Sequence, residues 1–306
     1  MVAKAKAIAI AVDVGNRLIK TNNTVYGSGV SACVTEPPFR SNVMKIDGNC
    51  YVVGTEKTTV KPQSEDEFTE VRYLATLAKE LKSQNYYSAD IILGVGVHFS
   101  GMGVEGKKLK NRLLSRRYWE FKFEGELFRI TIVDVIVFAQ GYSAVADRLD
   151  KLQMPTVVCD IGGYTNDVIL ITDGVPDMSR SKSLQIGTIT CINDIQEVFR
   201  MKYSNEISEK VIEEVMMTNS SYILSGEHIN TVRNELKKYA DKVMDYLNTF
   251  KMSPDYYRIV FIGGGSCIMK NFGLQHKNIE YHLDPKVNAI GYQKLLELMI
   301  RQGRWS

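Results

Sequence analysis

The strongest signal in the sequence is an apolar run that ends in an acidic, glycine-rich loop, Val157-Val158-Cys159-Asp160-Ile161-Gly162-Gly163-Tyr164-Thr165-Asn166-Asp167. Consecutive backbone N–H groups in a glycine-containing turn can surround anionic oxygens. A carboxylate at the end of the preceding strand can hold Mg²⁺ through the waters of the ion. The segment therefore predicts a strand, a phosphate-binding loop and a returning strand.

The same pattern occurs near the N-terminus. Ile8-Ala9-Ile10-Ala11-Val12 leads into Asp13-Val14-Gly15-Asn16, and a third apolar run, Ile259-Val260-Phe261-Ile262, ends in Gly263-Gly264-Gly265-Ser266. One Asp-Gly pair alone is more typical of a simple turn than of a site. The matched context in both halves favours a site, so the two loops predict a nucleotide cleft between two related domains.

Length and composition are those of an ordinary globular protein. The chain has 306 residues, 44% of them hydrophobic and 24% charged, and a net charge of +3. This length fits two domains of roughly 150 residues each. We place the first at 1–150 and the second at 151–285, and we expect a C-terminal helix over 286–306 to pack back on the first. The charge predicts no direct nucleic-acid binding and no membrane partner, and no apolar run reaches the roughly 20 residues of a membrane span.

The cysteines favour a reducing compartment. They are Cys33, Cys50, Cys159, Cys191 and Cys267. Because they show no close pair and no zinc-type spacing, we expect buried free thiols in a cytoplasmic protein. The N-terminal run carries Lys4 and Lys6 but is short and interrupted by Asp13, which predicts a first strand rather than a signal peptide.

Hydrophobic periodicity gives the other elements. Strands are expected at 17–20, 43–46, 51–54, 91–97, 119–123, 127–132, 133–138 and 168–171, and helices at 67–81, 140–152, 188–199 and 227–250. Turns at Asp47-Gly48-Asn49 and Glu124-Gly125-Glu126 predict two hairpins. The predicted class is α/β, with a mixed sheet flanked by helices in each half.

Four residues of the two loops have a direct chemical interpretation. Asp13 ends an apolar strand, where a carboxylate needs a cation or several donors, and Asp160 occupies the matching position. Lys20 can neutralise phosphate oxygens, although a strand lysine can also simply be solvated. Thr165 can donate its hydroxyl to phosphate. Asp167 has two open interpretations, a capping residue of the loop or a partner of a metal-bound water.

The chain resembles a known superfamily at these residues. The Asp-x-Gly-x-x-x-x-Lys of the first loop, the Asp-Ile-Gly-Gly-x-Thr-x-Asp of the second and the run into Gly263-Gly264-Gly265 look like the phosphate and adenosine elements of the actin, hexokinase and chaperone ATPases. The likeness extends nearly end to end. It is greatest to the bacterial plasmid-segregation actins of the ParM/StbA type, in which a basic segment such as 107–117 precedes a hairpin, a strand and a Gly-Tyr helix like Gln140-Gly141-Tyr142. The resemblance implies an actin-like, ribonuclease H-like duplicated fold.

The resemblance also implies roles for individual residues. Gln140 would orient the attacking water, Asp13 and Asp160 would act in catalysis and hold the metal through water, and Gly291 would allow close helix packing at the second inter-domain connection. The ParM type usually has Glu where this chain has Gln140. The implied nucleotide-binding residues are Asp13, Gly15, Asn16, Arg17, Lys20, Gly162, Gly163, Tyr164, Thr165, Gly187, Gly263, Gly264 and Gly265. Gly187 and Thr188, at the start of a helix, could approach the nucleotide with backbone N–H groups, whereas Glu209 and Lys210 fit an exposed helical face better than a ribose contact.

The implied function is a filament-forming, cytoplasmic ATPase that segregates plasmid or phage DNA. ATP, or GTP, and Mg²⁺ would be the cofactors. Subunits would polymerise with nucleotide bound, and filaments would disassemble after hydrolysis. A separate, ParR-like DNA-binding adaptor would link the filament to DNA. Two alternatives stay open at this point: a small-molecule kinase of the same fold, and a nucleotide-binding scaffold with little hydrolysis. The kinase needs an acidic base in a substrate pocket, and no such motif stands between Asn22 and Asp90.

Three other patterns carry less weight. Gly101-Met102-Gly103-Val104-Glu105-Gly106-Lys107-Lys108 nearly matches a P-loop but lacks the final Ser or Thr that binds Mg²⁺. The basic residues of 107–117, with Tyr118 and Trp119 beside them, fit a solvated helix face better than a DNA-binding surface. The histidines, His98, His228, His276 and His282, show no ligand spacing.

Overall fold

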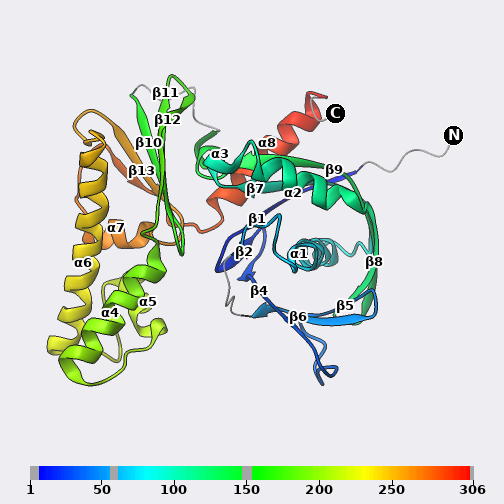
Figure 1. Ribbon diagram of the computed structural model, residues 1–306, viewed down its shortest axis with the longest axis horizontal. Coiled ribbons are helices and arrows are strands. Elements are labelled where there is room, and N and C mark those ends of the chain that lie inside the picture. The colour runs from blue at the N-terminus through cyan, green and yellow to red at the C-terminus, as the bar shows by residue number, and fades with distance from the viewer. Residues whose placement is uncertain (1–6, 56–60, 147–153, 304–306) are drawn as a thin grey trace. The chain divides into compact units, whose positions relative to one another are not determined.

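The computed structural model describes residues 7–55, 61–146 and 154–303. It forms two compact units, which we call unit 1 (residues 1–147 and 288–306) and unit 2 (residues 148–287). Each unit consists of a β-sheet flanked by helices (Figure 1). The expectations that concern Lys4 and Lys6 lie outside the described residues.

Unit 1 contains a nine-stranded sheet in the order β3-β2-β1-β7-β9-β8-β5-β6-β4. Its strands are β1 (Ile8–Val14), β2 (Leu18–Lys20), β3 (Val25–Gly27), β4 (Gly29–Ala32), β5 (Val43–Ile46), β6 (Asn49–Thr55), β7 (Ser88–Val97), β8 (Tyr118–Phe123) and β9 (Glu126–Ala139). Its helices are α1 (Thr69–Ser83), α2 (Glu105–Ser115), α3 (Tyr142–Val145) and α8 (Val287–Arg301), with a 3₁₀ turn at Phe99–Gly101.

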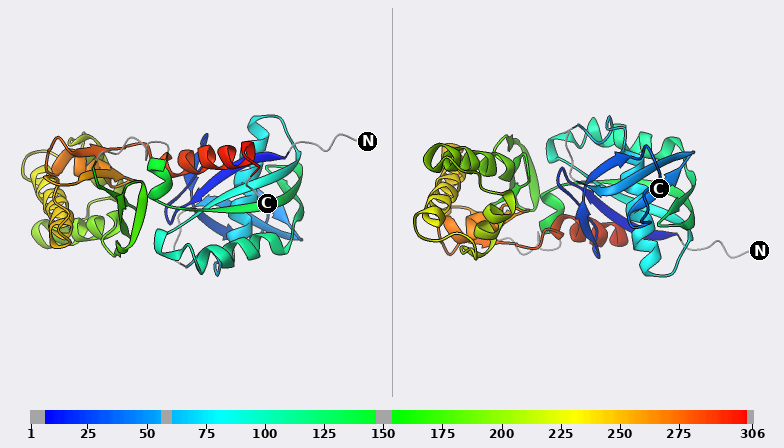
Figure 2. Two further views of the ribbon diagram at one scale, coloured as in Figure 1. Left: turned by 90° about the horizontal axis from the view of Figure 1, so that it is seen from above. Right: turned by 90° about the horizontal axis from the view of Figure 1, so that it is seen from below.

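The helices of unit 1 cover both faces of the sheet. Alternate residues of β1 point to opposite faces, so Ile10 and Val12 join the core that contains α1 and α2. Ala11 points the other way and packs with Tyr292 and Leu296 of α8. Figure 2 shows α8 and α2 along opposite faces of these strands. The central strands are therefore shielded from water on both sides, which places the end of β1 in a low-dielectric environment.

Unit 2 contains a five-stranded sheet in the order β12-β11-β10-β13-β14. Its strands are β10 (Thr156–Ile161), β11 (Asn166–Thr172), β12 (Val175–Leu184), β13 (Arg258–Ile262) and β14 (Ile279–Tyr281). Its helices are α4 (Thr188–Tyr203), α5 (Glu209–Thr218), α6 (Gly226–Thr249) and α7 (Ser266–Phe272). All four helices contribute to one core with alternate residues of β10, β11 and β13. The ribbons of these helices are labelled in Figure 1.

The two sheets repeat one local topology. In unit 1, β1 pairs antiparallel with β2 and parallel with β7. In unit 2, β10 pairs antiparallel with β11 and parallel with β13. Each acidic loop therefore joins the central strand of such a trio to its antiparallel neighbour, as the sequence predicts.

Turn chemistry fixes the two predicted hairpins. At the β5–β6 turn Asp47 and Gly48 both have positive φ, 49° and 79°, and at the β8–β9 turn Glu124 and Gly125 have 53° and 89°. Two consecutive residues with positive φ match the right-handed twist of the flanking strands. Both hairpins thus form where the Gly-containing turns predict them.

Two elements differ from the expectation. The helix expected from Gln140 to Leu152 begins later, because β9 continues to Ala139, and its described part is α3, Tyr142–Val145. The rest of the expected helix, 147–152, lies outside the described residues. The strand β12 has no counterpart among the predicted elements, because most of its residues are exposed and its sequence carries no apolar alternation. Among the helices of the described ranges, none combines the length and the apolar character needed to cross a bilayer.

Candidate functional site

Asp13 is the centre of a polar cluster in unit 1. It lies near the end of β1, and its side chain is almost fully buried, with 1% of the residue exposed. The Lys20 ammonium, directly opposite on β2, lies 3.0 Å from Oδ2. The Gln140 side-chain amide donates to Oδ1 at 3.0 Å. A buried carboxylate is stable only with such donors, so the three predicted residues come together as one polar cluster.

The turn after Asp13 leaves no room for a larger residue. The Gly15 N–H donates to the Leu18 carbonyl at 2.9 Å, and a Cβ on Gly15 would lie 2.9 Å from that oxygen and 3.0 Å from Lys20 Nζ. Ser28 donates its hydroxyl to the Asn16 carbonyl and its N–H to the Arg17 carbonyl. These bonds hold the loop in one conformation, with Gly15, Asn16 and Arg17 half-buried.

The orientation of the Gln140 amide follows from chemistry. A carboxylate only accepts hydrogen bonds, so the amide nitrogen of Gln140 must face Asp13, and its Oε1 points to the other side of the amide. The backbone N–H of Gln140 donates to the Val97 carbonyl. Gly141, with φ of 76°, then donates its N–H to the Asn288 side chain. Gln140 is thus fixed at both its backbone and its side chain.

Gln63 is a residue of this site that the sequence did not reveal. Its amide nitrogen donates to the carbonyls of Val14 and Gly96, at 3.1 and 3.2 Å, at the ends of β1 and β7. Tyr73 donates its hydroxyl to Gln63 Oε1 at 2.6 Å. Burial, and then the negative charge of Asp13, raises the pKa of Tyr73 well above its usual value, so the phenol stays a donor. Gln63 therefore joins two strand ends beside the first loop.

The acidic loop of unit 2 lies between two aspartates on adjacent strands. Asp160 on β10 lies directly opposite Asp167 on β11, and Asp167 is 6% exposed. Residues directly opposite in an antiparallel pair point to the same face, with Cβ atoms roughly 5 Å apart. Two like charges so placed repel each other unless a cation or hydrogen-bond donors compensate, and carboxylates are preferred ligands of Mg²⁺. In unit 1 the corresponding position, opposite Asp13, carries a lysine.

The loop between these strands is bonded to the N-terminus of α4. Gly187, Thr188 and Ile189 donate their N–H groups to the carbonyls of Tyr164, Gly162 and Gly163, at 3.0, 3.0 and 2.8 Å. A Cβ on Gly187 would lie 2.3 Å from the Gly163 carbonyl oxygen. The N–H groups of Gly187 and Thr188, which we expected to reach a nucleotide, are therefore used within unit 2. Their role in this structure is to hold the loop, inside which Gly162 donates to Thr165.

The glycine run after β13 packs against the same strand end. Gly263 has φ of 80°, and a Cβ there would lie 2.5 Å from Asp160 Oδ1. A Cβ on Gly265 would lie 2.2 Å from the Ile161 side chain, whereas Gly264 faces open space. Gly263 and Gly265 thus bring this segment onto Asp160, and Gly264 is the accessible member of the run.

Gly291 lies where α8 crosses α3. A Cβ on Gly291 would lie 2.1 Å from the Ser143 carbonyl oxygen. The two helices of unit 1 therefore approach as closely as a glycine allows.

On α5 of unit 2, Glu209 is half-buried and Lys210 is exposed.

The P-loop-like segment has another structure. Glu105 to Lys108 belong to α2, and the Glu105 carboxylate accepts hydrogen bonds from the N–H and hydroxyl of Ser64. Several cations of the basic run have acidic partners: Arg112 with Glu70, Lys110 with Asp134, Arg116 with Asp47 and Lys108 with Glu65. This pairing lowers the positive charge that a nucleic acid would meet.

In the ranges that the structure describes, no cluster of three or more His, Cys, Asp or Glu side chains forms a metal site.

Comparison with known proteins places this geometry in context. Residues 158–273 match the model of a protein family, the C-terminal part of the MreB-like archaeal actin homologues. No protein of curated function matches the sequence.

Several solved structures share the fold of the whole chain. The archaeal actin homologue Ta0583 has a TM-score of 0.75 at 19% identity, over 95% of this chain and 99% of that one. The actin-like protein Alp7A has a TM-score of 0.75 at 15% identity, over 97% and 98%. ParM from Bacillus thuringiensis with ATP has a TM-score of 0.70 at 13% identity, over 95% and 98%. This chain therefore has the actin-like fold that archaeal and plasmid actin homologues share.

Proposed function

We propose that this protein is a filament-forming ATPase of the actin type, whose phosphate loops bind the nucleotide. The observation that carries the proposal is the buried cluster of Asp13, Lys20 and Gln140. It combines a carboxylate, an ammonium and an oriented amide at the end of a central strand. The fold supports it too: Ta0583 has been solved with ADP and Bacillus thuringiensis ParM with ATP.

Lys20 and the glycine turns would bind the phosphates. The ammonium of Lys20 has 17% of its side chain exposed and lies 3.0 Å from Asp13, so it can contact both the carboxylate and an incoming anion. In unit 2 the loop Gly162 to Thr165 is half-buried and rigidly bonded to α4. A loop held in one conformation can present its other N–H groups to phosphate with little further ordering cost.

The carboxylates fit a magnesium ion bound through its waters. Mg²⁺ prefers oxygen ligands and usually keeps several waters. Asp160 and Asp167 provide adjacent carboxylates on one sheet face. Both Asp13 oxygens already accept from protein donors, but each retains a lone pair for a metal-bound water. The ion would neutralise charge on the phosphates, and these side chains would orient its hydration shell.

Gln140 would orient the attacking water. Its amide nitrogen is held by Asp13, so its carbonyl oxygen faces away from the carboxylate and can accept a proton of water. Phosphoryl transfer needs mainly positioning and electrostatic stabilisation, and an amide can align a water without acting as a strong base. Gln140 would thus set the rate of hydrolysis without being required for nucleotide binding.

We further propose that nucleotide binding drives self-association and that the cargo is plasmid or phage DNA, held through a separate DNA-binding adaptor. This part rests on the resemblance to ParM and Alp7A. One ParM with this fold is described as a non-polymerisable mutant, which points to polymerisation in that protein. The paired charges of 107–117 argue for an adaptor rather than direct DNA contact.

The test is light scattering at 90° with phosphate release followed in parallel, after addition of Mg²⁺-ATP, Mg²⁺-GTP or a non-hydrolysable analogue. Scattering should rise with triphosphate, decay as phosphate appears, and persist with the analogue. Gln140→Ala should slow phosphate release and prolong the scattering, whereas the matched control Gln302→Ala, in the exposed turn just after α8, should behave like wild type. Turnover without scattering, only on addition of small metabolites, would instead identify a kinase. A flat trace without turnover would identify a scaffold.

A further inference from the structure

Cys33 and Cys50 form a pair that the sequence did not predict. Ala32 at the end of β4 lies opposite Tyr51 on β6, so the next positions along this antiparallel ladder are Cys33 and Cys50. The Cys33 N–H donates to the Cys50 carbonyl at 2.8 Å. Both residues are half-exposed. The expectation of buried thiols is therefore wrong for these two, and the ladder brings them together although they are distant in sequence.

The pair continues into a row of cations across the sheet. Cys50 lies opposite Lys45 on β5, and Lys45 lies opposite Lys122 on β8. Directly opposite residues share a face, so two thiols and two ammonium groups follow one another across four strands. Met44 and Ile46, which flank Lys45, belong to the core of unit 1. The row therefore lies on the outer face of the sheet, away from that core.

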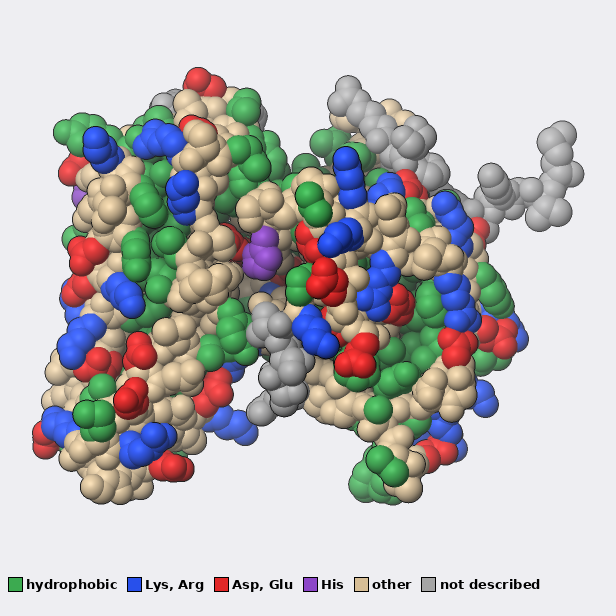
Figure 3. All heavy atoms as spheres, in the orientation of Figure 1, with side chains coloured by type: hydrophobic (Ala, Val, Ile, Leu, Met, Phe, Trp, Pro, Cys, Tyr) green, Lys and Arg blue, Asp and Glu red, His purple; other side chains and the backbone are tan. Residues whose placement is uncertain are grey.

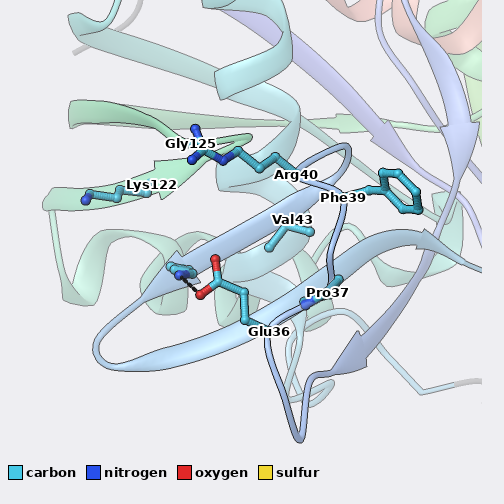
Figure 4. A pocket seen from close by; sticks show the side chains of 8 residues that line it. Glu36, Pro37, Phe39, Arg40, Val43, Lys122 and Gly125 are labelled. Carbon is cyan, nitrogen blue, oxygen red and sulfur yellow. Dashed lines mark ion pairs between the residues drawn. The ribbon is translucent and has the colours of Figure 1, made fainter.

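Two cavities lie along this row. One of about 260 Å³ is lined by both cysteines and by Glu36, and a second of about 140 Å³ is lined by Glu36, Arg40, Lys45 and Lys122. Figure 4 shows Glu36, Arg40 and Lys122 around the second cavity, with the ion pair of Glu36 and Lys45, 2.6 Å, as a dashed line. Three cations and one carboxylate leave a net positive charge next to the thiols.

The segment above the row is exposed and partly apolar. Val34 and Phe39, which follow Cys33, are 102% and 79% exposed. Figure 3 shows hydrophobic side chains at the tip of the segment that projects beyond β4 and β6. The link between Cys33 and Cys50 would close the base of this projecting segment.

We propose that Cys33 and Cys50 are a redox-active dithiol that reacts with low-molecular-weight disulfides carrying carboxylates. The thiolate of Cys33 attacks one sulfur of the disulfide, forms a mixed disulfide and releases one thiol, which takes up the proton that Cys33 has lost. The thiolate of Cys50 then attacks the Cys33 sulfur, closes the internal disulfide and releases the second thiol. The protein loses two hydrogen atoms, and the reagent is reduced to two thiols.

The backbone geometry is compatible with the product. Opposing residues in an antiparallel ladder have Cβ atoms about 4.5–5.5 Å apart, and a disulfide needs about 3.5–4.5 Å. The pair stands at the end of the β4 ladder, where β4 stops at Ala32, so a small movement of Cys33 suffices. The cations beside the pair would hold the carboxylates of the reagent while the first exchange takes place.

The acidity of the thiols sets the conditions of the reaction. Burial, followed by the contact with the Cys50 thiol, raises the pKa of Cys33 to about 11. Thiolate is therefore scarce at neutral pH. As long as the pH lies below that pKa, the rate of the first exchange should rise roughly tenfold for each unit by which the pH is raised. The second exchange is internal, so mixed disulfides should not accumulate in the wild type.

The experiment treats the full chain with oxidised glutathione at mildly alkaline pH. Peptide mass spectrometry without reduction should show Cys33 linked to Cys50 in the wild type, with two of the five thiols lost and no retained glutathione. Cys33→Ser and Cys50→Ser should each retain glutathione on the remaining cysteine. Cys267→Ser, the matched control for a half-exposed thiol elsewhere in the chain, should still form the link. Survival of both thiols, or a link to another cysteine, would overturn the dithiol.

The charge recognition has its own test with a neutral reagent. Lys122→Gln should slow the reaction with oxidised glutathione about two- to threefold, as expected for one exposed charge, and leave the rate with bis(2-hydroxyethyl) disulfide unchanged. An equal effect on both reagents would refute recognition of carboxylates. These outcomes do not depend on nucleotide, so they stand apart from the proposed ATPase.

Discussion

Replacing Gln140 by glutamate should destabilise unit 1 in a pH-dependent way. In the wild type the amide nitrogen lies 3.0 Å from Asp13 Oδ1, and the substitution Gln140→Glu puts a second carboxylate at that distance. Two unit charges 3.0 Å apart at an effective dielectric constant of 20 repel by roughly 5.5 kcal/mol. The introduced group can escape this cost by protonation, which takes about 3.7 kcal/mol at pH 7 from a pKa of about 4.3. We therefore expect a loss of roughly 4 kcal/mol at neutral pH.

The direction of the pH dependence follows from linkage. The folded pKa of the introduced carboxyl lies above its unfolded value, so the folded state binds the extra proton. The free energy of unfolding of Gln140→Glu should be highest below about pH 4.3, and it should fall as the pH rises through the folded pKa. Gln140→Ala is the matched control, since it removes the same hydrogen bond, worth about 1.5–3 kcal/mol, without adding a charge.

Urea unfolding followed by tryptophan fluorescence measures this difference. Trp119 lies in β8 of the same unit and is 8% exposed, so it reports on unit 1. The two variants should be of similar stability near pH 5 and diverge toward pH 8. A constant difference between them across this range would refute the contact of Gln140 with a charged Asp13.

Three further predictions follow from other contacts. Asp160→Asn should remove Mg²⁺-dependent phosphate release, measured in a magnesium titration, because it removes one of the two adjacent carboxylates; normal turnover would contradict its metal role. Gly291→Ala should lower the free energy of unfolding by about 3 kcal/mol, because its Cβ would lie 2.1 Å from a carbonyl oxygen. The control Gly103→Ala, whose Cβ would have nothing within 4 Å, should leave the free energy of unfolding nearly unchanged. Urea unfolding measures both. Closing a disulfide between Cys33 and Cys50 should stabilise unit 1 by roughly 3 kcal/mol, seen as a higher Tm in calorimetry that dithiothreitol reverses; an unchanged Tm would show that the bond strains the native state.

The strand-turn-strand form of the two acidic loops is predicted well from the sequence because its signals are local. An apolar strand, a terminal aspartate and glycines occur within a dozen residues, and the turns at Asp47-Gly48 and Glu124-Gly125 need only their own backbone conformation. The contact of Gln140 with Asp13 agrees with roles that the resemblance implied, but its geometry required the fold.

Features that depend on distant partners were not predictable. Gln63 acts through carbonyls of Val14 and Gly96, and nothing in its neighbouring sequence indicates this. The strand β12 lies at a sheet edge and is held by backbone pairing with β11. Because this pairing does not require apolar side chains, its sequence shows no alternation of apolar and polar residues. The bond of Gly187 is another such feature, because its N–H meets the Tyr164 carbonyl only after the loop has folded back.

The bonding of the second loop to α4 has a mechanical consequence. Three successive N–H groups at the start of α4 hold three successive carbonyls of the loop, so loop and helix cannot shift independently without breaking these bonds. The helix has 16 residues, which at 1.5 Å per residue makes it about 24 Å long. A small displacement of the loop would therefore reach the opposite end of α4 undiminished, where Tyr203 contacts Thr231 of α6. We therefore expect α4 to move as one rigid element and to transmit a displacement of the loop to a distant part of unit 2.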